Sequence, residues 1–95
     1  MSLRLCVLLW SNTGAEAALV SYEDRVLELM DAHGARVLQR ARTDGADGSP
    51  LEIQLLEFPS RVALERYMED ERRVALTDER DAAIARTEVL EIDLI

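Results

Sequence analysis

The chain has 95 residues, the size of one domain, and its 48% hydrophobic and 32% charged residues give it the composition of a globular protein. Nineteen Asp and Glu stand against eleven Arg and Lys, so the formal net charge is -8 with the single His neutral. This acidity argues against nucleic acid as a partner, because phosphate binding needs a surplus of cations. It argues equally against binding to an anionic membrane surface.

Cysteine content and hydropathy exclude further classes of protein. The sequence has one cysteine, Cys6, which can form neither an internal disulfide nor a cysteine cluster for a structural metal. No apolar run approaches the roughly 20 residues that span a bilayer. The apolar stretch near the N-terminus ends at polar Ser11, too early for a signal peptide. We therefore expect a single cytoplasmic domain, residues 1–95, with no metal and no cofactor.

The first two predicted elements are a strand and a helix. Residues 3–10 (LRLCVLLW) are apolar and too few for a globular helix, which favours a strand. Apolar residues then recur at helical spacing over residues 15–33, after a predicted capping box of Thr13 and Glu16. Gly34 supplies the left-handed residue that ends such a helix. Four acidic residues fall off the apolar stripe and are expected in water: Glu23, Asp24, Glu28 and Asp31.

A hairpin and a second helical region follow. Residues 35–42 and 51–58 alternate as strands do, and the loop between them, residues 44–50 (DGADGSP), has the composition of a turn. Pro59 and Ser60 then predict a helix start with Ser60 as the N-cap. The helical pattern extends over residues 61–83 but is interrupted at the charged run EDERR, which predicts two pieces meeting near Glu69 and Asp70. Residues 87–95 (TEVLEIDLI) predict the last strand.

The order β-α-β-β-α-β predicts an α+β, ferredoxin-like fold, a four-stranded antiparallel sheet with its helices on one face. The helices need an apolar surface, so the cleaner face of each strand is expected beneath them. That face is predicted to carry Leu3, Leu5, Val7, Leu9, Val37, Ile53, Leu55, Leu90, Ile92 and Leu94.

The opposite face is predicted to mix large apolar and charged side chains. Its apolar members are Leu8, Trp10, Leu38, Leu56, Phe58, Val89 and Ile95, and its polar members are Arg4, Arg36, Arg40, Glu52, Gln54, Glu91 and Asp93. A solvated face rarely displays so many large apolar residues, and a monomer interior rarely so many charges. A homodimer formed sheet against sheet fits both observations.

Several stretches resemble the dimeric α+β barrel superfamily, and within it a small bacterial family known only as a domain of unknown function. They are residues 33–40 (HGARVLQR), like that family's Gly-Gly-Arg-aromatic-Leu-x-Arg, residues 56–60 (LEFPS), then Ala63, Tyr67 and Arg80. The resemblance implies two ferredoxin-like subunits packed sheet against sheet. It also implies relatives that include small monooxygenases, isomerases and decarboxylase-like proteins acting on aromatic or lactone substrates.

The candidate ligand-binding residues are polar and aromatic groups expected near the sheet: Arg40, Arg36, Glu52, Gln54, Trp10 and Tyr67. Arg on one hairpin strand and Glu or Gln on the other form either a structural cross-strand pair or the polar group of a ligand pocket. Trp10 and Tyr67 serve either a packed core or the wall of a cleft. Arg40 is the strongest candidate, because it also matches the family-like stretch.

His33 and Cys6 have simpler interpretations. A histidine at a helix C-terminus is stabilised by the helix dipole, and without a local partner in the sequence His33 is favoured as structural rather than as a general base. Cys6 on a strand is favoured as a small hydrophobe rather than as a reactive thiol.

Three functions remain open from the sequence. The first is a homodimer that binds a small organic molecule between sheet and helices, since no nucleophile–base pair stands out. The second is a cofactor-independent enzyme, monooxygenase- or isomerase-like, acting on a small aromatic or lactone substrate. The third is a purely structural dimerisation module.

Overall fold

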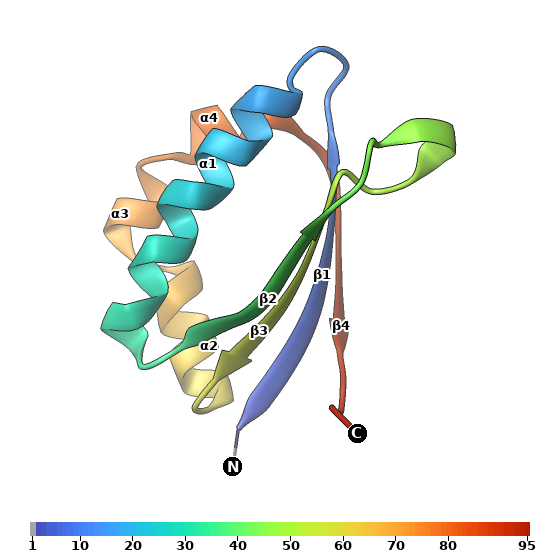
Figure 1. Ribbon diagram of the computed structural model, residues 1–95. Helices are drawn as coiled ribbons and strands as arrows, with labels where there is room; N and C mark the ends of the chain where they lie inside the picture. Colours follow the sequence, from blue (N-terminus) through green and yellow to red (C-terminus); the bar gives the residue numbers. More distant parts are fainter. Residues whose placement is uncertain (1) are drawn as a thin grey trace.

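A computed structural model describes residues 2–95 and places the helices on one side of a four-stranded sheet (Figure 1). The strands are β1 (Leu3–Ser11), β2 (Arg36–Arg42), β3 (Glu52–Phe58) and β4 (Ile84–Glu91). The helices are α1 (Glu16–Glu28), α2 (Arg61–Met68), α3 (Glu71–Val74) and α4 (Thr77–Ala83). A short 3₁₀ segment, Leu29–His33, extends α1, and a second one, Ala46–Gly48, lies in the hairpin loop between β2 and β3.

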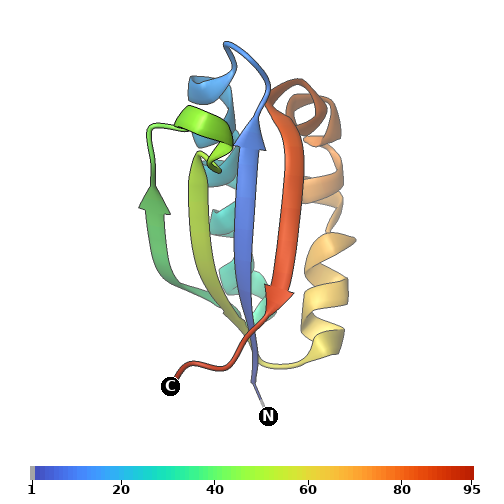
Figure 2. The same ribbon diagram turned by 90° about the vertical axis from the view of Figure 1, so that its right-hand side faces the viewer.

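The sheet has the strand order β2-β3-β1-β4, and every neighbouring pair is antiparallel. The two central strands, β1 and β3, are thus far apart in sequence, while β2 and β4 are the edges (Figure 2). Together with helices on one face only, this order is the ferredoxin-like fold that the element sequence predicts.

Helix α1 forms because its apolar stripe is buried against the sheet, with Leu19, Tyr22 and Val26 almost wholly covered. The predicted capping box is wrong: Thr13 and Gly14 form a turn, and Ala15 occupies the N-cap with no side-chain hydrogen bond. At the other end the prediction is confirmed, because Gly34 adopts φ of 69° and closes the last turn.

The second helical region begins as predicted and breaks near Glu69 and Asp70, but it forms three pieces rather than the predicted two. The Ser60 hydroxyl accepts a hydrogen bond from the Ala63 amide at 3.1 Å, which caps α2. Asp70 then caps α3 by accepting from the amide of Arg72 at 2.9 Å. A third piece, α4, follows and ends at Ala83, so β4 begins three residues earlier than Thr87, where the sequence pattern placed it.

The predicted facing of β3 and β4 is wrong. Antiparallel partners share a face, and Leu5 of β1, which lies beneath the helices, pairs with Leu56 and Glu91. The helix side of these two strands therefore carries Glu52, Gln54, Leu56, Phe58, Thr87, Val89 and Glu91. Ile53, Leu55 and Leu90 lie on the opposite face, and Ile92, Asp93, Leu94 and Ile95 lie beyond the end of β4.

A bulge in β2 separates two arginines that were predicted to share a face. The register shifts between Val37 and Gln39, which leaves Leu38 without a cross-strand partner. Arg36 pairs with Glu57 on the open face, whereas Arg40 pairs with Gln54 on the helix side. The extra residue thus moves Arg40, but not Arg36, beneath the helices.

The open face of the sheet, which no helix covers, is turned toward the viewer in Figure 2. Its centre is apolar and is formed by Cys6, Leu8, Trp10, Ile53, Leu55 and Leu90, called here the open-face cluster. Charged residues lie at its margins, where the Glu57 carboxylate accepts hydrogen bonds from Arg4 at 3.0 Å and from Arg36 at 2.9 Å. These bonds, that from Arg36 above all, hold the pKa of Glu57 below its usual range.

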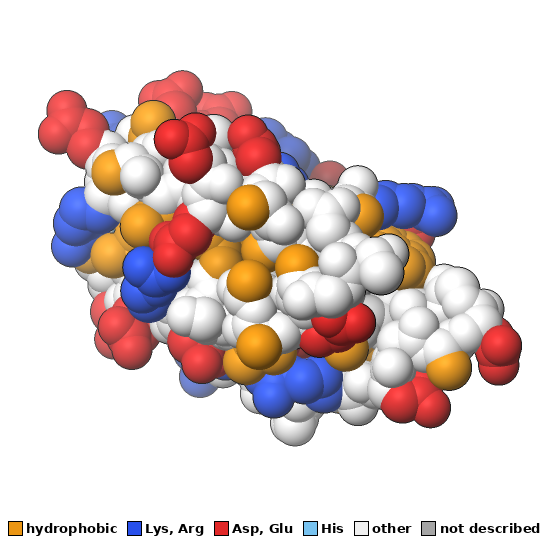
Figure 3. Space-filling model, turned by 90° about the horizontal axis from the view of Figure 1, so that it is seen from above, with side chains coloured by type: hydrophobic (Ala, Val, Ile, Leu, Met, Phe, Trp, Pro, Cys, Tyr) orange, Lys and Arg blue, Asp and Glu red, His pale blue; other side chains and the backbone are white. Residues whose placement is uncertain are grey.

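The hairpin loop is fastened to β1 by Trp10. The indole Nε1 donates to the Gly48 carbonyl at 2.8 Å, and the Arg86 guanidinium lies 4.5 Å from the indole ring centre. Seen from above, charged side chains lie around the rim of this end of the molecule and apolar ones lie nearer its middle (Figure 3).

Candidate functional site

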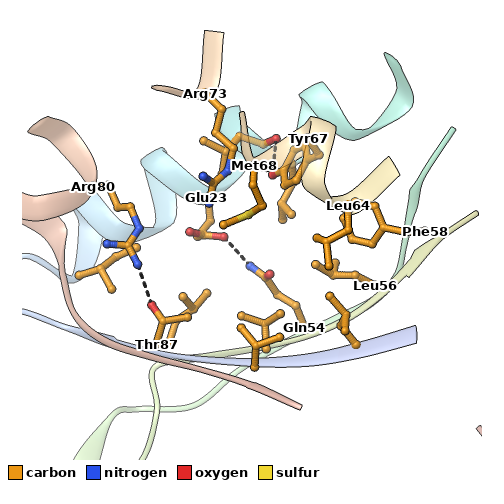
Figure 4. Close-up of a pocket in the computed structure, with 17 residues that line it drawn as sticks. Glu23, Gln54, Leu56, Phe58, Leu64, Tyr67, Met68, Arg73, Arg80 and Thr87 are labelled. Carbon is orange, nitrogen blue, oxygen red and sulfur yellow. Dashed lines mark hydrogen bonds between the residues drawn. The ribbon is translucent and has the colours of Figure 1, made fainter. Parts of the chain in front are cut away.

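A pocket of about 290 Å³ lies between the sheet and the helices. Strands β1, β3 and β4 supply its floor and helices α1 to α4 its walls and rim (Figure 4). The lining is mainly aliphatic and aromatic and includes Leu5, Val7, Leu9, Val26, Leu27, Leu56, Phe58, Leu64, Met68, Ile84 and Val89. Its polar members are Glu23, Gln54, Tyr67, Arg73, Arg80 and Thr87.

Glu23 is the carboxylate that lines this pocket, and it is buried, with 6% of its surface exposed. Its carboxylate accepts a hydrogen bond from the Gln54 side-chain amide at 2.8 Å. Burial raises the pKa of Glu23, although the bond from Gln54 and the nearby Arg73 and Arg40 act against that rise. The sequence pattern placed this residue in water, and that prediction is wrong.

Gln54 links Glu23 to a second buried carboxylate, Glu52, which is fully covered. The same Gln54 nitrogen donates to Glu52 at 2.7 Å. Glu52 is neutralised from the β2 side, where Arg40 donates to both of its oxygens at 2.9 and 3.0 Å and Arg42 donates to one at 3.2 Å. Charges buried with such partners cost far less than isolated ones.

Arg40 is therefore held by the protein itself. Besides Glu52 it donates to Asp24 of α1 at 2.8 Å, which ties the sheet edge to the helix. Arg40, Glu52 and Gln54 are brought together as the sequence predicts, but only Gln54 of the three lines the pocket.

Tyr67 of α2 also lines the pocket. Its hydroxyl donates to the Val26 carbonyl at 2.9 Å, and burial raises the pKa of that hydroxyl to about 12, so it remains a donor at neutral pH. The ring packs against Phe58 with centres 5.6 Å apart. Tyr67 thus anchors α2 to α1 while forming one wall of the pocket.

Arg36 and Trp10 lie on the open face of the sheet and do not line this pocket. His33 is also engaged elsewhere: its Nε2 lies 2.8 Å from an oxygen of Asp70, and its ring meets Tyr67 edge to face. This pair joins the end of the α1 segment to the start of α3. Hydrogen bonds from Arg72, and then from His33, lower the pKa of Asp70.

The charged residues that line the pocket, Glu23, Arg73 and Arg80, were not among the predicted ligand-binding residues. Arg73 and Arg80 belong to the second helical region, which is rich in charged residues. The sequence pattern there does not indicate which charged side chains point into the protein. The one sequence signal came from Arg80, which lies in the family-like pattern.

Other site classes find little support in the described part of the chain. Within residues 2–95, no group of three His, Cys, Asp or Glu side chains is placed to hold a metal ion. None of the helices in this range has the length and apolarity needed to cross a membrane. Cys6 is partly exposed in the open-face cluster.

Comparison with solved structures identifies the same fold in bacterial proteins. A DABB family protein of Mesorhizobium loti with a ferredoxin-like fold aligns with a TM-score of 0.70 at 13% identity, over 99% of this chain and 97% of that one. A dimeric protein of unknown function from Bacteroides fragilis, also ferredoxin-like, aligns with a TM-score of 0.71 at 9% identity, over 98% and 96%. A proposed antibiotic biosynthesis monooxygenase of Caulobacter crescentus aligns with a TM-score of 0.78 at 14% identity, over 99% and 90%.

These structural alignments establish the fold alone, which is ferredoxin-like. No protein-family model matches the sequence, and no curated protein matches it either. The predicted resemblance to one bacterial family of unknown function therefore stays a prediction.

Proposed function

We propose that this protein is a cytoplasmic homodimer in which each protomer binds a small organic molecule in the pocket between sheet and helices. The observation that carries the proposal is the pocket itself, an apolar cavity of about 290 Å³ with a few polar groups. Binding sites for small molecules are concave and mostly apolar, with a few polar groups that orient the ligand. Because such sites usually measure about 300–1,000 Å³, the ligand is small.

The open-face cluster supports the homodimer. Its apolar side chains are contiguous across three strands, and monomeric proteins rarely expose a large apolar patch to water. The structurally similar Bacteroides fragilis protein is described as dimeric. Since the pocket lies on the other side of the sheet, pairing through this face leaves ligand access unobstructed.

Filling the pocket tests the proposed binding. Met68→Trp places a larger side chain at the rim, where Met68 is 48% exposed, so the indole blocks the pocket without disturbing the buried core. The probes are 2-naphthoate and its neutral amide, 2-naphthamide. We expect at least one of them to shift the Gln54 side-chain amide signal saturably in ¹H–¹⁵N spectra of the wild type. In Met68→Trp the affinity falls at least tenfold.

The matched control is Val62→Trp, on the same helix and 53% exposed, but outside the pocket lining. It retains wild-type binding. If neither probe shifts pocket signals in the wild type, ligand binding is wrong and the structural dimerisation module becomes the better interpretation. If Met68→Trp and Val62→Trp behave alike, the probe binds somewhere else.

A second candidate function is a proton-transferring, isomerase-like enzyme that acts on a small aromatic or lactone substrate. The observation that favours it is Glu23, a carboxyl group in an apolar pocket whose burial raises its pKa, as general acids and bases require. A panel of lactones and quinols would show turnover by the wild type. Glu23→Gln would abolish turnover while retaining substrate binding, whereas equal loss of binding would assign Glu23 a role in affinity only.

A further inference from the structure

The lining of the pocket carries more positive than negative charge. Arg73 of α3 and Arg80 of α4 both line it, and Glu23 is its one acidic lining residue. Even with Glu23 ionised, the pocket therefore carries a net positive charge. The whole chain has a net charge of -8. The charge of the pocket lining is therefore opposite in sign to the net charge of the molecule.

Arg73 lies near enough to Glu23 to oppose the rise in the pKa of that carboxyl group, but the two do not form a direct ion pair. Arg73 forms an ion pair with none of the carboxylates of residues 2–95. Its buried Nε finds no hydrogen-bond acceptor among the described residues, and its guanidinium lies 5.2 Å from the ring centre of Tyr67. A buried donor without an acceptor costs free energy, and such groups in native proteins call for an explanation. One such explanation is that a bound ligand supplies the acceptor.

Arg80 of α4 is positioned by a contact with β4. Its Nη2 donates to the Thr87 hydroxyl of β4 at 3.2 Å, while the Asp81 carboxylate lies 3.8 Å from its Nη1, beyond hydrogen-bond distance. Figure 4 shows Arg73 and Arg80 at the end of the pocket where Glu23 lies, with Leu56, Phe58 and Leu64 at the other end. The pocket thus has a cationic end and an apolar end.

We propose, on the basis of the proposed binding function, that the ligand is a small carboxylate with an apolar body, whose carboxylate is bound by Arg73 and Arg80. The planar guanidinium of an arginine can donate two parallel hydrogen bonds to the two oxygens of a carboxylate. A neutral amide of the same shape has only one such oxygen and accepts only one of these bonds. The apolar body lies against Leu56, Phe58 and Leu64. The carboxylate gives the Arg73 Nε the acceptor that the free protein lacks.

The experiment compares 2-naphthoate with 2-naphthamide, which have nearly the same shape and differ in charge, by isothermal titration calorimetry at pH 7. We expect the carboxylate to bind at least tenfold more tightly than the amide. Arg73→Met and Arg80→Met each weaken naphthoate binding about 10- to 100-fold, the range of a hydrogen bond to a charged group, and leave naphthamide binding unchanged. Arg66→Met, an exposed α2 arginine outside the pocket lining, is the matched control and retains wild-type affinity.

A spectroscopic measurement on the wild type makes the test independent of how the variants fold. The Arg73 Nε–H resonance shifts downfield on saturation with naphthoate and stays in place with naphthamide. Equal affinity for the two probes, or an unchanged Arg73 resonance with bound naphthoate, overturns the carboxylate proposal and leaves pocket binding intact. Failure of both probes to bind overturns the pocket proposal together with it.

Discussion

Glu23 is buried because its neighbours supply what water would otherwise provide. One of its oxygens accepts from Gln54, and the positive charges of Arg73 and Arg40 lower the cost of its negative charge. Burial still dominates, so the folded protein binds a proton at this carboxyl group more tightly than the unfolded chain does. Glu23 therefore links protein stability to pH.

The sign of that linkage gives the first prediction at this scale. A carboxyl group with a raised pKa in the folded state favours folding at low pH, and that contribution is lost as pH rises through the raised value. Glu23→Gln removes the buried charge but keeps an amide oxygen for Gln54. We expect the melting temperature of the variant, relative to the wild type, to increase from pH 4 to pH 8. The increase is roughly 5–10 °C for every tenfold difference in proton affinity between the folded and the unfolded chain.

Thermal unfolding followed by circular dichroism across this pH range measures the effect. Glu28→Gln, an exposed position of the same helix, serves as the control and keeps a constant difference from the wild type. A difference between Glu23→Gln and the wild type that does not change with pH would show that Glu23 carries its ordinary affinity for protons in the folded protein.

Elements were predictable from the sequence wherever a local signal decides them. Ser60 caps α2 through its own hydroxyl, and Gly34 ends the α1 segment because a positive φ favours glycine. The element order then leads to the ferredoxin-like arrangement, because few topologies accommodate β-α-β-β-α-β with short connections.

The facing of the strands was not predictable, because alternation divides a strand into two sets without saying which set the helices cover. In β3 the more apolar set, with Ile53 and Leu55, lies on the open face. Glu52 and Gln54 occupy the helix side because Arg40, Arg42 and Glu23 satisfy their polar groups there. Three-dimensional pairing of polar groups thus overrides hydrophobicity.

The candidate site depends on these long-range relations even more than the fold does. Arg40 reaches Glu52 only because a bulge at Leu38 changes the face of β2. Glu23 and Gln54 are 31 positions apart in the sequence and meet across the layer between helix and sheet. No spacing rule along the chain relates such residues, which is why the pocket's polar group was predicted only through Gln54 and Tyr67.

At the scale of the whole molecule, the two proposed roles fall on opposite faces of the sheet. Its helix side encloses the pocket, which is lined by strands β1, β3 and β4 and by helices α1 to α4. Its open face carries the open-face cluster, with a margin of paired charges around Glu57. The corrected facing makes the centre of this face more apolar than the sequence pattern indicated, which strengthens the argument for a second copy of the chain on it.

Leu8→Arg tests this pairing at its centre. Leu8 lies between Ile53 and Glu88 on the open face. An arginine at this position would be buried in the dimer, and the free energy needed to remove its charge from water would exceed what dimerisation provides. We expect the wild type to sediment at micromolar concentration with twice the mass of the 10.7 kDa chain, and Leu8→Arg with the mass of one chain. Val74→Arg, an exposed apolar position on α3, remains dimeric. A wild type that sediments as a monomer, or a Leu8→Arg variant that stays dimeric, contradicts pairing through this face. Because Leu8 lies on the open face and does not line the pocket, we expect the monomeric variant to retain naphthoate binding, which would separate assembly from ligand recognition.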